Sequence, residues 1–206
     1  MSFGLFVISS EQWVANEHEV LPQLFAAGLT TFHVRKPGWP RAELEAYLRA
    51  IPAQYHPRVV LHAHYELALE YPFQGIHLTT HARQQPATAP LLRRLRGRSV
   101  SASLHSLAEV AGHRRRYDYV FLSPIFDSTS KAGYCGKFHL PDVRRTLAAG
   151  QRRRAYRPQV VALGGITPAT VGLARQLGFH GAAVLGGIWQ QADPVAAFRA
   201  LQAEIR

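Results

Sequence analysis

The feature that most constrains the fold of this chain is an eightfold alternation of short β-rich runs with longer amphipathic stretches along 206 residues. The run Tyr119–Leu122, for example, supplies the aromatic and β-branched residues that are typical of strands buried on both faces of a parallel sheet. The predicted strands are Gly4–Ser9, Thr30–Arg35, Val59–His64, Gly75–Thr79, Ser99–Ser103, Tyr119–Ser123, Gln159–Leu163 and Ala182–Leu185.

A helical stretch follows each predicted strand. Examples are Pro40–Ile51, Leu107–Arg116, Pro168–Gly178 and Pro194–Ile205. Thr167 and Asp193 are capping residues placed before a proline at the first helical position, and Gly28 and Gly178 are expected at helix ends. Eight such units in a chain of this length predict an α/β fold, a closed (β/α)8 TIM barrel forming a single domain over residues 1–206. An open doubly wound sheet is the alternative, although the first strand lacks the Gly-rich turn typical of that fold.

The formal net charge of +11 raises the question of nucleic-acid binding. The arginines concentrate near helix ends and in the loops that lead into the next strand, which in a barrel lie opposite the usual active site. Aromatic residues are not interleaved with them, as they are in proteins that bind single strands. We therefore expect a solvated basic surface and no nucleic-acid partner.

The sequence lacks a membrane-spanning run, a leader-like start and a second cysteine, and these features bear on where in the cell the protein is found. No apolar run approaches the roughly 20 residues that cross a membrane, and Met1–Gln12 has no basic start followed by a long apolar stretch. The single cysteine, Cys135, cannot form an internal disulfide, which agrees with a reducing compartment. We expect a soluble, cytoplasmic protein that does not bind membranes. Exposed apolar residues on the outer helices of a barrel often mark a homodimer, and the sequence leaves that question open.

The segment Tyr117–Phe138 ends in a hydroxyl-rich loop that follows a predicted strand. Ser128, Thr129, Ser130 and Lys131 offer three hydroxyls and an ammonium in consecutive positions, a set suited to holding a phosphate or diphosphate. An ordinary surface loop can also be rich in Ser and Thr.

Polar side chains at the carboxyl ends of several strands are expected to face a substrate. His33 and Arg35 are two residues apart and so lie on one side of their strand, and the same spacing recurs in three further strands, at His62/His64, His77/Thr79 and Ser101/Ser103/His105. His77 is interpreted as a satisfied core histidine. His105 directly precedes the expected helix start at Ser106 and is the preferred proton shuttle, because imidazole exchanges protons near neutral pH.

Two glycine pairs, Gly164-Gly165 and Gly186-Gly187, follow the seventh and eighth strands. Glycine lets the backbone approach an anion closely, and the loops after these strands hold phosphate in many barrels. Simple turn chemistry also requires glycine. With a phosphate pocket, a Gly187→Val change is expected to block the pocket and leave the fold nearly intact.

At these positions the chain resembles the thiamine phosphate synthase and thiazole tautomerase family. The matching segments are His33–Arg35, Glu66–Ala68 with Gly75–Leu78, Ser103–Ser106, Tyr119–Lys131, Gly164–Pro168 and Ala183–Ile188. The resemblance implies a barrel that binds a thiazole phosphate and acts in thiamin biosynthesis. In synthases of the family a pyrimidine diphosphate is bound as well, and its diphosphate leaves as the thiazole nitrogen attacks.

The chain departs from the family's synthases where these carry aspartates that hold magnesium. Ala63 and Ala82 stand at those two positions, His33 replaces a glutamine, and Lys36-Pro37 replaces a Glu-Lys pair. Histidine is a poor substitute for the oxygen ligands that magnesium prefers. Without the metal, diphosphate departure needs side-chain cations, for which Lys131, Arg35 and Lys36 are candidates.

A thiazole tautomerase moves one proton and requires no metal, so we prefer this reading of the sequence. The expected catalytic residues are His105, Lys131 and Ser103. The expected substrate- and phosphate-binding residues are His33, Arg35, Ser128, Ser130, Lys131, Gly164, Gly165, Gly186 and Gly187. The first alternative is a thiamine phosphate synthase, which would require magnesium. The second is a non-catalytic barrel that binds thiamin precursors or a transition metal, with His62, His64, His77 and His81 as ligands.

Overall fold

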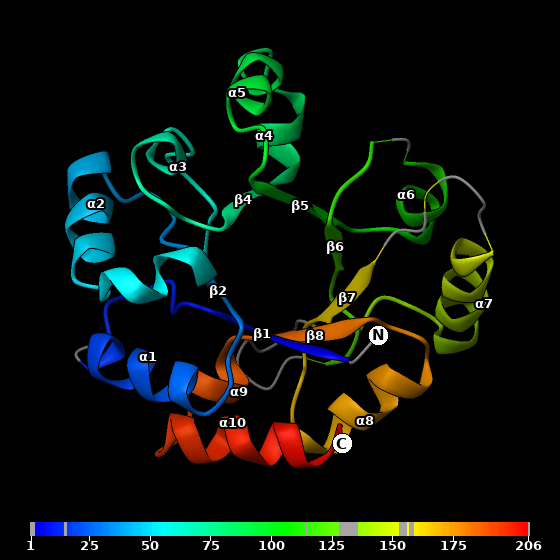
Figure 1. Ribbon diagram of the computed structural model, residues 1–206. Helices are drawn as coiled ribbons and strands as arrows, with labels where there is room; N and C mark the ends of the chain where they lie inside the picture. Colours follow the sequence, from blue (N-terminus) through cyan, green and yellow to red (C-terminus); the bar gives the residue numbers. More distant parts are fainter. Residues whose placement is uncertain are drawn as a thin grey trace.

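The computed structural model describes residues 3–14, 16–113, 115–127, 136–152, 156 and 159–205. Eight parallel strands form a closed barrel in the order of the sequence, and β1 pairs with β8 (Figure 1). The strands are β1 (Gly4–Ile8), β2 (Thr31–Val34), β3 (Val59–Leu61), β4 (Gly75–Leu78), β5 (Ser99–Leu104), β6 (Tyr119–Leu122), β7 (Val160–Leu163) and β8 (Gly181–Val184). The barrel predicted from the sequence is confirmed, and the open sheet is excluded because β1 and β8 leave no free edge.

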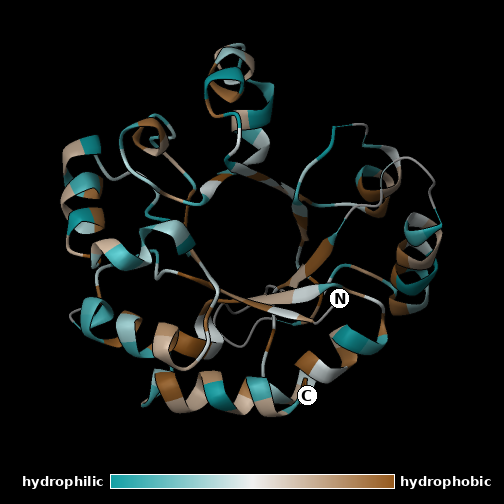
Figure 2. Cartoon of the chain, in the orientation of Figure 1, coloured by the Kyte–Doolittle hydropathy of each residue, from teal (hydrophilic) through white to brown (hydrophobic). Residues whose placement is uncertain are grey.

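Helices surround the barrel on its outer side (Figure 1). They are α1 (Glu17–Ala26), α2 (Arg41–Arg49), the 3-10 helix η1 (Ala53–Arg58), α3 (Leu67–Glu70), α4 (Thr80–Gln84), α5 (Thr88–Arg94), α6 (Leu107–Gly112), α7 (Leu140–Gln151), α8 (Pro168–Gln176), α9 (Gly186–Trp189) and α10 (Pro194–Ala203). Their hydrophilic and hydrophobic residues alternate along the chain (Figure 2). In α2, for example, Leu44, Tyr47 and Leu48 are buried at the spacing of one helix face.

The strands separate two apolar clusters. Phe32 and Val34 of β2 belong to the large cluster between the strands and the helices. A smaller cluster, which includes Tyr119 and Phe121, fills part of the barrel interior. His33 lies between Phe32 and Val34 in sequence and so points to the opposite side of the strand, where its ring centroid is 4.8 Å from that of Phe121. Inside the barrel, histidine rings therefore pack directly against the aromatic residues of the smaller cluster.

The predicted helix starts at Leu107, Pro168 and Pro194 are accurate, because capping residues mark them, whereas α6 ends at Gly112 instead of Arg116. Asp193 accepts hydrogen bonds from the N–H groups of Val195 and Ala196, and Ser106 accepts one from Glu109. Gly28 and Gly178 follow α1 and α8 with φ values of 105° and 96°, as expected at helix ends. The third strand, however, ends at Leu61 instead of His64, because His64 adopts φ 47° and leaves the extended conformation.

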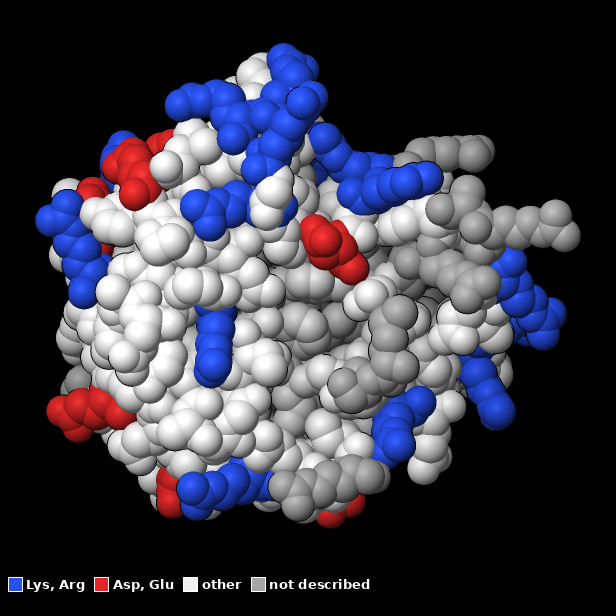
Figure 3. Space-filling model, viewed as in Figure 1, with Lys and Arg blue, Asp and Glu red and all other residues white. Residues whose placement is uncertain are grey.

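Basic side chains are spread over the face seen in Figure 3 and gather over the region of α4 and α5. Arg93 and Arg94 lie in the last turn of α5, and Arg98 directly precedes β5. Arg144 and Arg145 differ from the expectation, since they lie on the exposed side of α7 and not at its end. None of the helices in the described ranges has the length and apolar character to span a membrane.

Candidate active site

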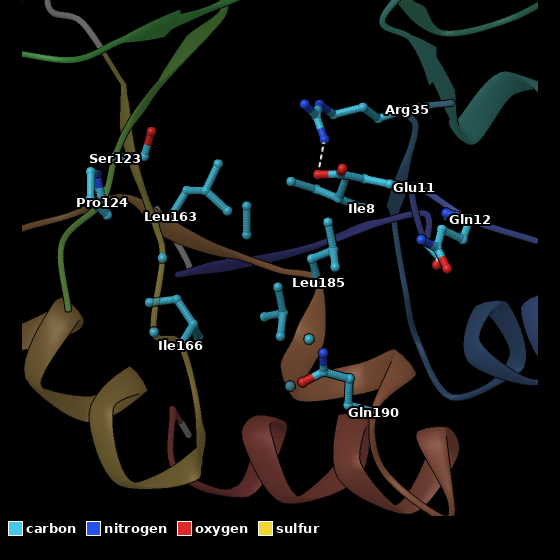
Figure 4. A pocket seen from close by; sticks show the side chains of 17 residues that line it. Ile8, Glu11, Gln12, Arg35, Ser123, Pro124, Leu163, Ile166, Leu185 and Gln190 are labelled. Carbon is cyan, nitrogen blue, oxygen red and sulfur yellow. Dashed lines mark hydrogen bonds and ion pairs between the residues drawn. The ribbon is translucent and has the colours of Figure 1, made fainter. Parts of the chain in front are cut away.

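A pocket of about 470 Å³ lies at the carboxyl ends of β1, β2, β6, β7 and β8. This volume is within the range of small-molecule sites. Leu163, Ile166 and Leu185 supply apolar surface, while Arg35 and Ser123 bring polar groups from β2 and β6 (Figure 4). Both predicted glycine pairs line the same pocket.

The glycine pairs bring unbonded backbone donors to this pocket. Within the described residues, no hydrogen bond has the N–H group of Gly165, Gly186 or Gly187 as its donor. Gly164 and Gly165 adopt φ values of 100° and 63°, so the turn after β7 needs glycine for its shape. Unbonded N–H groups beside a concave surface are suited to an anion such as a phosphate.

Gly187 has a structural role that the sequence did not reveal. A Cβ atom at this position would come within 2.6 Å of the carbonyl oxygen of Ile166 and 2.9 Å of Val184 Cγ1. The expectation that Gly187→Val blocks the pocket and spares the fold is therefore wrong, because the side chain would collide with the backbone after β7.

Arg35 is the cation of the pocket wall. Its backbone is fixed by Ser9, whose Oγ accepts a hydrogen bond from Arg35 N at 2.8 Å and donates one to Arg35 O at 3.1 Å. The guanidinium forms an ion pair with Glu11, which also lines the pocket (Figure 4). With about a third of each side chain exposed, this pair can exchange partners with an incoming anion.

Lys36, the next residue, cannot act as a substrate cation in this structure. Its Nζ is 2.6 Å from Glu17 Oε2, and both side chains are almost completely buried. The ammonium also lies over the rings of Tyr47 and Trp39, at 4.7 and 5.2 Å from their centroids. Burial raises the pKa of Glu17, while its contacts with Lys36 lower it in part. The sequence-based role of Lys36 beside a diphosphate is therefore wrong.

His105 lies at the edge of the pocket and not among its lining residues. It is exposed and directly follows β5, and its backbone N–H donates to Glu109 Oε2 at 2.7 Å. Its Nδ1 is 3.4 Å from the Oγ of Ser123, which lines the pocket. His105 can thus reach the pocket through the Ser123 hydroxyl.

Three of the predicted rim histidines are buried inside the barrel instead. His33 and His77 are inaccessible to solvent, and His62 is 9% exposed. His33 Nδ1 is 2.8 Å from His62 Nε2, and His33 Nε2 is 2.8 Å from the Tyr119 hydroxyl. The expectation that His33 contacts a substrate is therefore wrong, because its ring is enclosed.

His77 is held by two serine hydroxyls. Its Nδ1 is 2.9 Å from Ser101 Oγ and its Nε2 is 2.8 Å from Ser103 Oγ. This arrangement agrees with the interpretation of His77 as a core histidine. It also holds Ser103, one of the expected catalytic residues, in a hydrogen bond to His77, and Ser103 is not among the residues that line the pocket. Burial lowers the pKa of His77 to about 3, with the positive charge of Arg35 as a further cause. Burial likewise holds the pKa values of His33 and His62 well below the usual range, so all three rings are neutral at pH 7.

Two other histidines considered as metal ligands lie apart from this cluster. His64 Nε2 is 2.9 Å from the carbonyl oxygen of Trp39, and His81 Nε2 is 3.0 Å from Gln85 Nε2 within the α4 region. Ser128, Ser130 and Lys131, together with Thr129 and Cys135, lie outside the described residues. Their roles remain predictions from the sequence.

Comparison with known proteins identifies the family. The sequence model described as thiamine monophosphate synthase matches residues 5–188. The chain belongs to the thiamine monophosphate synthase family. It is 29% identical to the thiamine-phosphate synthase of Leuconostoc citreum over 199 residues, 91% of this chain and 90% of the relative. For the enzyme of Mannheimia succiniciproducens the identity is 27% over 180 residues, 82% and 78% of the two chains.

Solved structures agree with this family assignment. The crystal structure of thiamine phosphate pyrophosphorylase from Bacteroides thetaiotaomicron matches with a TM-score of 0.78 and 30% identity, covering 98% of this chain and 97% of that one. These three relatives are named for the synthase reaction. They support the synthase alternative, and they do not support the tautomerase reading preferred from the sequence.

The described residues do not form the magnesium site that synthases of the family use. Ala63 lies two residues after the end of β3, and Ala82 lies in α4. An alanine side chain has no oxygen, so neither position supplies a ligand for magnesium from its side chain. Across the described ranges, the one group of three or more converging His, Cys, Asp or Glu ligands consists of histidines alone. Magnesium binds oxygen in preference to imidazole nitrogen. The side chains in the described ranges therefore do not fit the ion.

Proposed function

We propose that this chain binds a thiazole phosphate in the pocket at the carboxyl ends of β1, β2, β6, β7 and β8. It joins this compound to a pyrimidine diphosphate and so forms thiamine phosphate. The observation that carries the proposal is the meeting of three unbonded glycine N–H groups with the Arg35 guanidinium in one pocket. Membership of a family in which similar proteins are named for this reaction supports it.

The glycine N–H groups would bind the phosphate of the thiazole, which fixes the ring above the apolar surface of Leu163 and Leu185. The ring nitrogen then attacks the pyrimidine carbon that carries the diphosphate. A carbon–nitrogen bond forms and the carbon–oxygen bond to the diphosphate breaks, with the electron pair leaving on the diphosphate oxygen. Arg35 lines the same pocket, so its guanidinium is placed to bind the thiazole phosphate together with the glycine N–H groups and to offset the negative charge that develops on the diphosphate. Holding both reactants in one pocket replaces an encounter in solution.

One observation favours a second candidate, the thiazole tautomerase. The described residues lack a cluster of carboxylates for magnesium, whereas a proton shift requires only a base, a phosphate site and donors that orient the ring. In that reaction His105 would remove and return the proton at the pocket edge, with Ser123 Oγ 3.4 Å from its Nδ1.

A turnover assay separates the two reactions. Purified protein is incubated with thiazole phosphate and pyrimidine diphosphate, in magnesium and in chelator, and thiamine phosphate is measured by chromatography. In parallel, the protein is given the thiazole carboxylate phosphate, and its isomerisation is followed. Formation of thiamine phosphate supports the synthase. Isomerisation without formation of thiamine phosphate would replace it by the tautomerase, and binding of thiazole phosphate without either reaction would indicate a non-catalytic barrel.

A further inference from the structure

We propose that His33, His62 and His77 form a binding site for a transition-metal ion such as Zn²⁺ inside the barrel. One ring nitrogen from each histidine lies within 4.8 Å of the corresponding nitrogen of the other two. The three side chains come from neighbouring strands, His33 from β2, His62 from the residue after β3, and His77 from β4. The site is separate from the proposed phosphate pocket, whose lining includes none of the three.

The strand register explains why the rings converge. Leu61 pairs with Ile76, so the next residues along the two strands, His62 and His77, are neighbours across β3 and β4. Their rings stack with centroids 4.3 Å apart, and His33 meets both edge-on at 5.1 and 5.3 Å. A tetrahedral zinc ion with Zn–N bonds of about 2.0–2.1 Å needs ligand nitrogens roughly 3.3 Å apart. The ring nitrogens of the three histidines lie within 4.8 Å of one another, so they must approach by at most about 1.5 Å to reach that spacing.

The surrounding hydroxyls provide the second set of contacts that a metal-binding histidine requires. A ligating imidazole donates its other N–H to an oxygen, which fixes the ring and its tautomer. The Tyr119 hydroxyl is 2.8 Å from His33 Nε2, which leaves Nδ1 directed at His62. Serine hydroxyls lie at both nitrogens of His77, so either nitrogen can bind a metal while the other donates.

The chemistry of the three side chains selects the class of metal. Each of the three side chains offers an imidazole nitrogen, and the neutral ring is the form that binds a metal. Imidazole suits zinc, copper and nickel and is a poor ligand for magnesium. Three histidines leave a fourth position for water or an anion.

Metal retention by the untagged protein tests this inference independently of any catalysed reaction. The protein is loaded with Zn²⁺, dialysed against a weak chelator and analysed for metal content. We expect about one zinc ion per chain, as three imidazoles and one open position hold zinc in known sites. In His62→Gln, which can still hydrogen-bond to His33, retention should be lost.

A matched control is His113→Gln, at the end of α6, where His113 contacts the carbonyl oxygens of Glu109 and Val110. This variant should retain zinc as the wild type does. X-ray absorption of the zinc-loaded wild type should report three imidazole ligands, and this result does not depend on how any variant folds. Loss of zinc from the wild type in dialysis, or a zinc ion with mainly oxygen ligands, would overturn the site and leave the three histidines as a hydrogen-bonded core.

Discussion

Arg35 forms an ion pair with Glu11 at the wall of the pocket, and both side chains are about one-third exposed. Arg35 lines the same pocket as the unbonded glycine N–H groups, yet its partner Glu11 brings a carboxylate into the pocket where an anion is expected to bind. An incoming phosphate must therefore compete with Glu11 for the guanidinium.

Replacing Arg35 should weaken phosphate binding. We expect Arg35→Ala to raise the Kd for thiazole phosphate roughly 10- to 100-fold, because a hydrogen bond to a charged group contributes about 1.5–3 kcal/mol. Glu11→Gln should lower the Kd, since it removes the competing charge. Isothermal titration calorimetry measures both, with Arg41→Ala as control, because Arg41 pairs with Glu70 on the surface. An unchanged Kd in Arg35→Ala would place the phosphate elsewhere.

His105 distinguishes the two candidate reactions. Attack by the thiazole nitrogen does not require a proton transfer through His105, so we expect His105→Ala to slow thiamine phosphate formation by less than about tenfold. A proton shift that used His105 would lose about 100- to 10,000-fold. The measurement is the rate of each reaction in this variant and in His139→Ala, an exposed histidine near Asp142. A large loss in the synthase assay would show that His105 takes part in that chemistry.

The buried pair Lys36–Glu17 should be important for stability and not for binding. Lys36→Met leaves the Glu17 carboxylate buried without its cation, for which we expect a loss of about 3–5 kcal/mol in the free energy of unfolding. The double variant Lys36→Met/Glu17→Gln should be more stable than Lys36→Met alone, since no uncompensated charge remains. Urea denaturation gives these values. If Lys36→Met instead retained full stability and lost affinity for thiazole phosphate, Lys36 would belong to the site after all.

The buried histidines predict a loss of stability in mild acid. In the unfolded chain a histidine has a pKa near 6.5, whereas burial lowers the pKa of His77 to about 3. As the pH falls through 6.5 the unfolded state binds a proton that the folded state does not, so folding stability decreases. Each such histidine contributes a slope of up to about 1.4 kcal/mol per pH unit.

His77→Gln removes one of these groups, so its stability should change less between about pH 7 and pH 5 than that of the wild type. Urea denaturation in the presence of a chelator measures the slope. The raised pKa of Glu17 acts in the opposite direction, but it is common to both proteins. Equal slopes in the two proteins would mean that His77 titrates normally in the folded state.

The barrel could be predicted from the sequence alone, because the sequence patterns that indicate its strands and helices are local. Short apolar runs, capping residues such as Asp193 and helix-ending glycines such as Gly178 each reflect a few neighbouring residues. Gly164, Gly165, Gly186 and Gly187 were also placed correctly in one pocket, since they follow the ends of adjacent strands. Glu11 and Gln190 were missed, although Glu11 lies just beyond β1 and the same rule about strand ends applies to it.

The histidines were harder to place, because the side of a strand that a residue faces does not determine how deeply its side chain is buried in the barrel. His33 and Arg35 share one side of β2, yet His33 is enclosed in the barrel and Arg35 reaches the pocket. The same limit explains Lys36, whose burial depends on its pairing with Glu17, 19 residues earlier at the start of α1. Likewise, the collision that forbids a side chain at Gly187 arises from Ile166, on the loop after a different strand.

The location of the thiazole phosphate is tested most directly by a crystal structure of the protein grown with that compound. We predict that the phosphate oxygens lie within hydrogen-bonding distance, about 2.7–3.2 Å, of the N–H groups of Gly165, Gly186 and Gly187. The Arg35 guanidinium should turn from Glu11 toward the phosphate. An empty pocket at saturating ligand, or a phosphate bound at another end of the barrel, would contradict the proposed site and the reaction built on it.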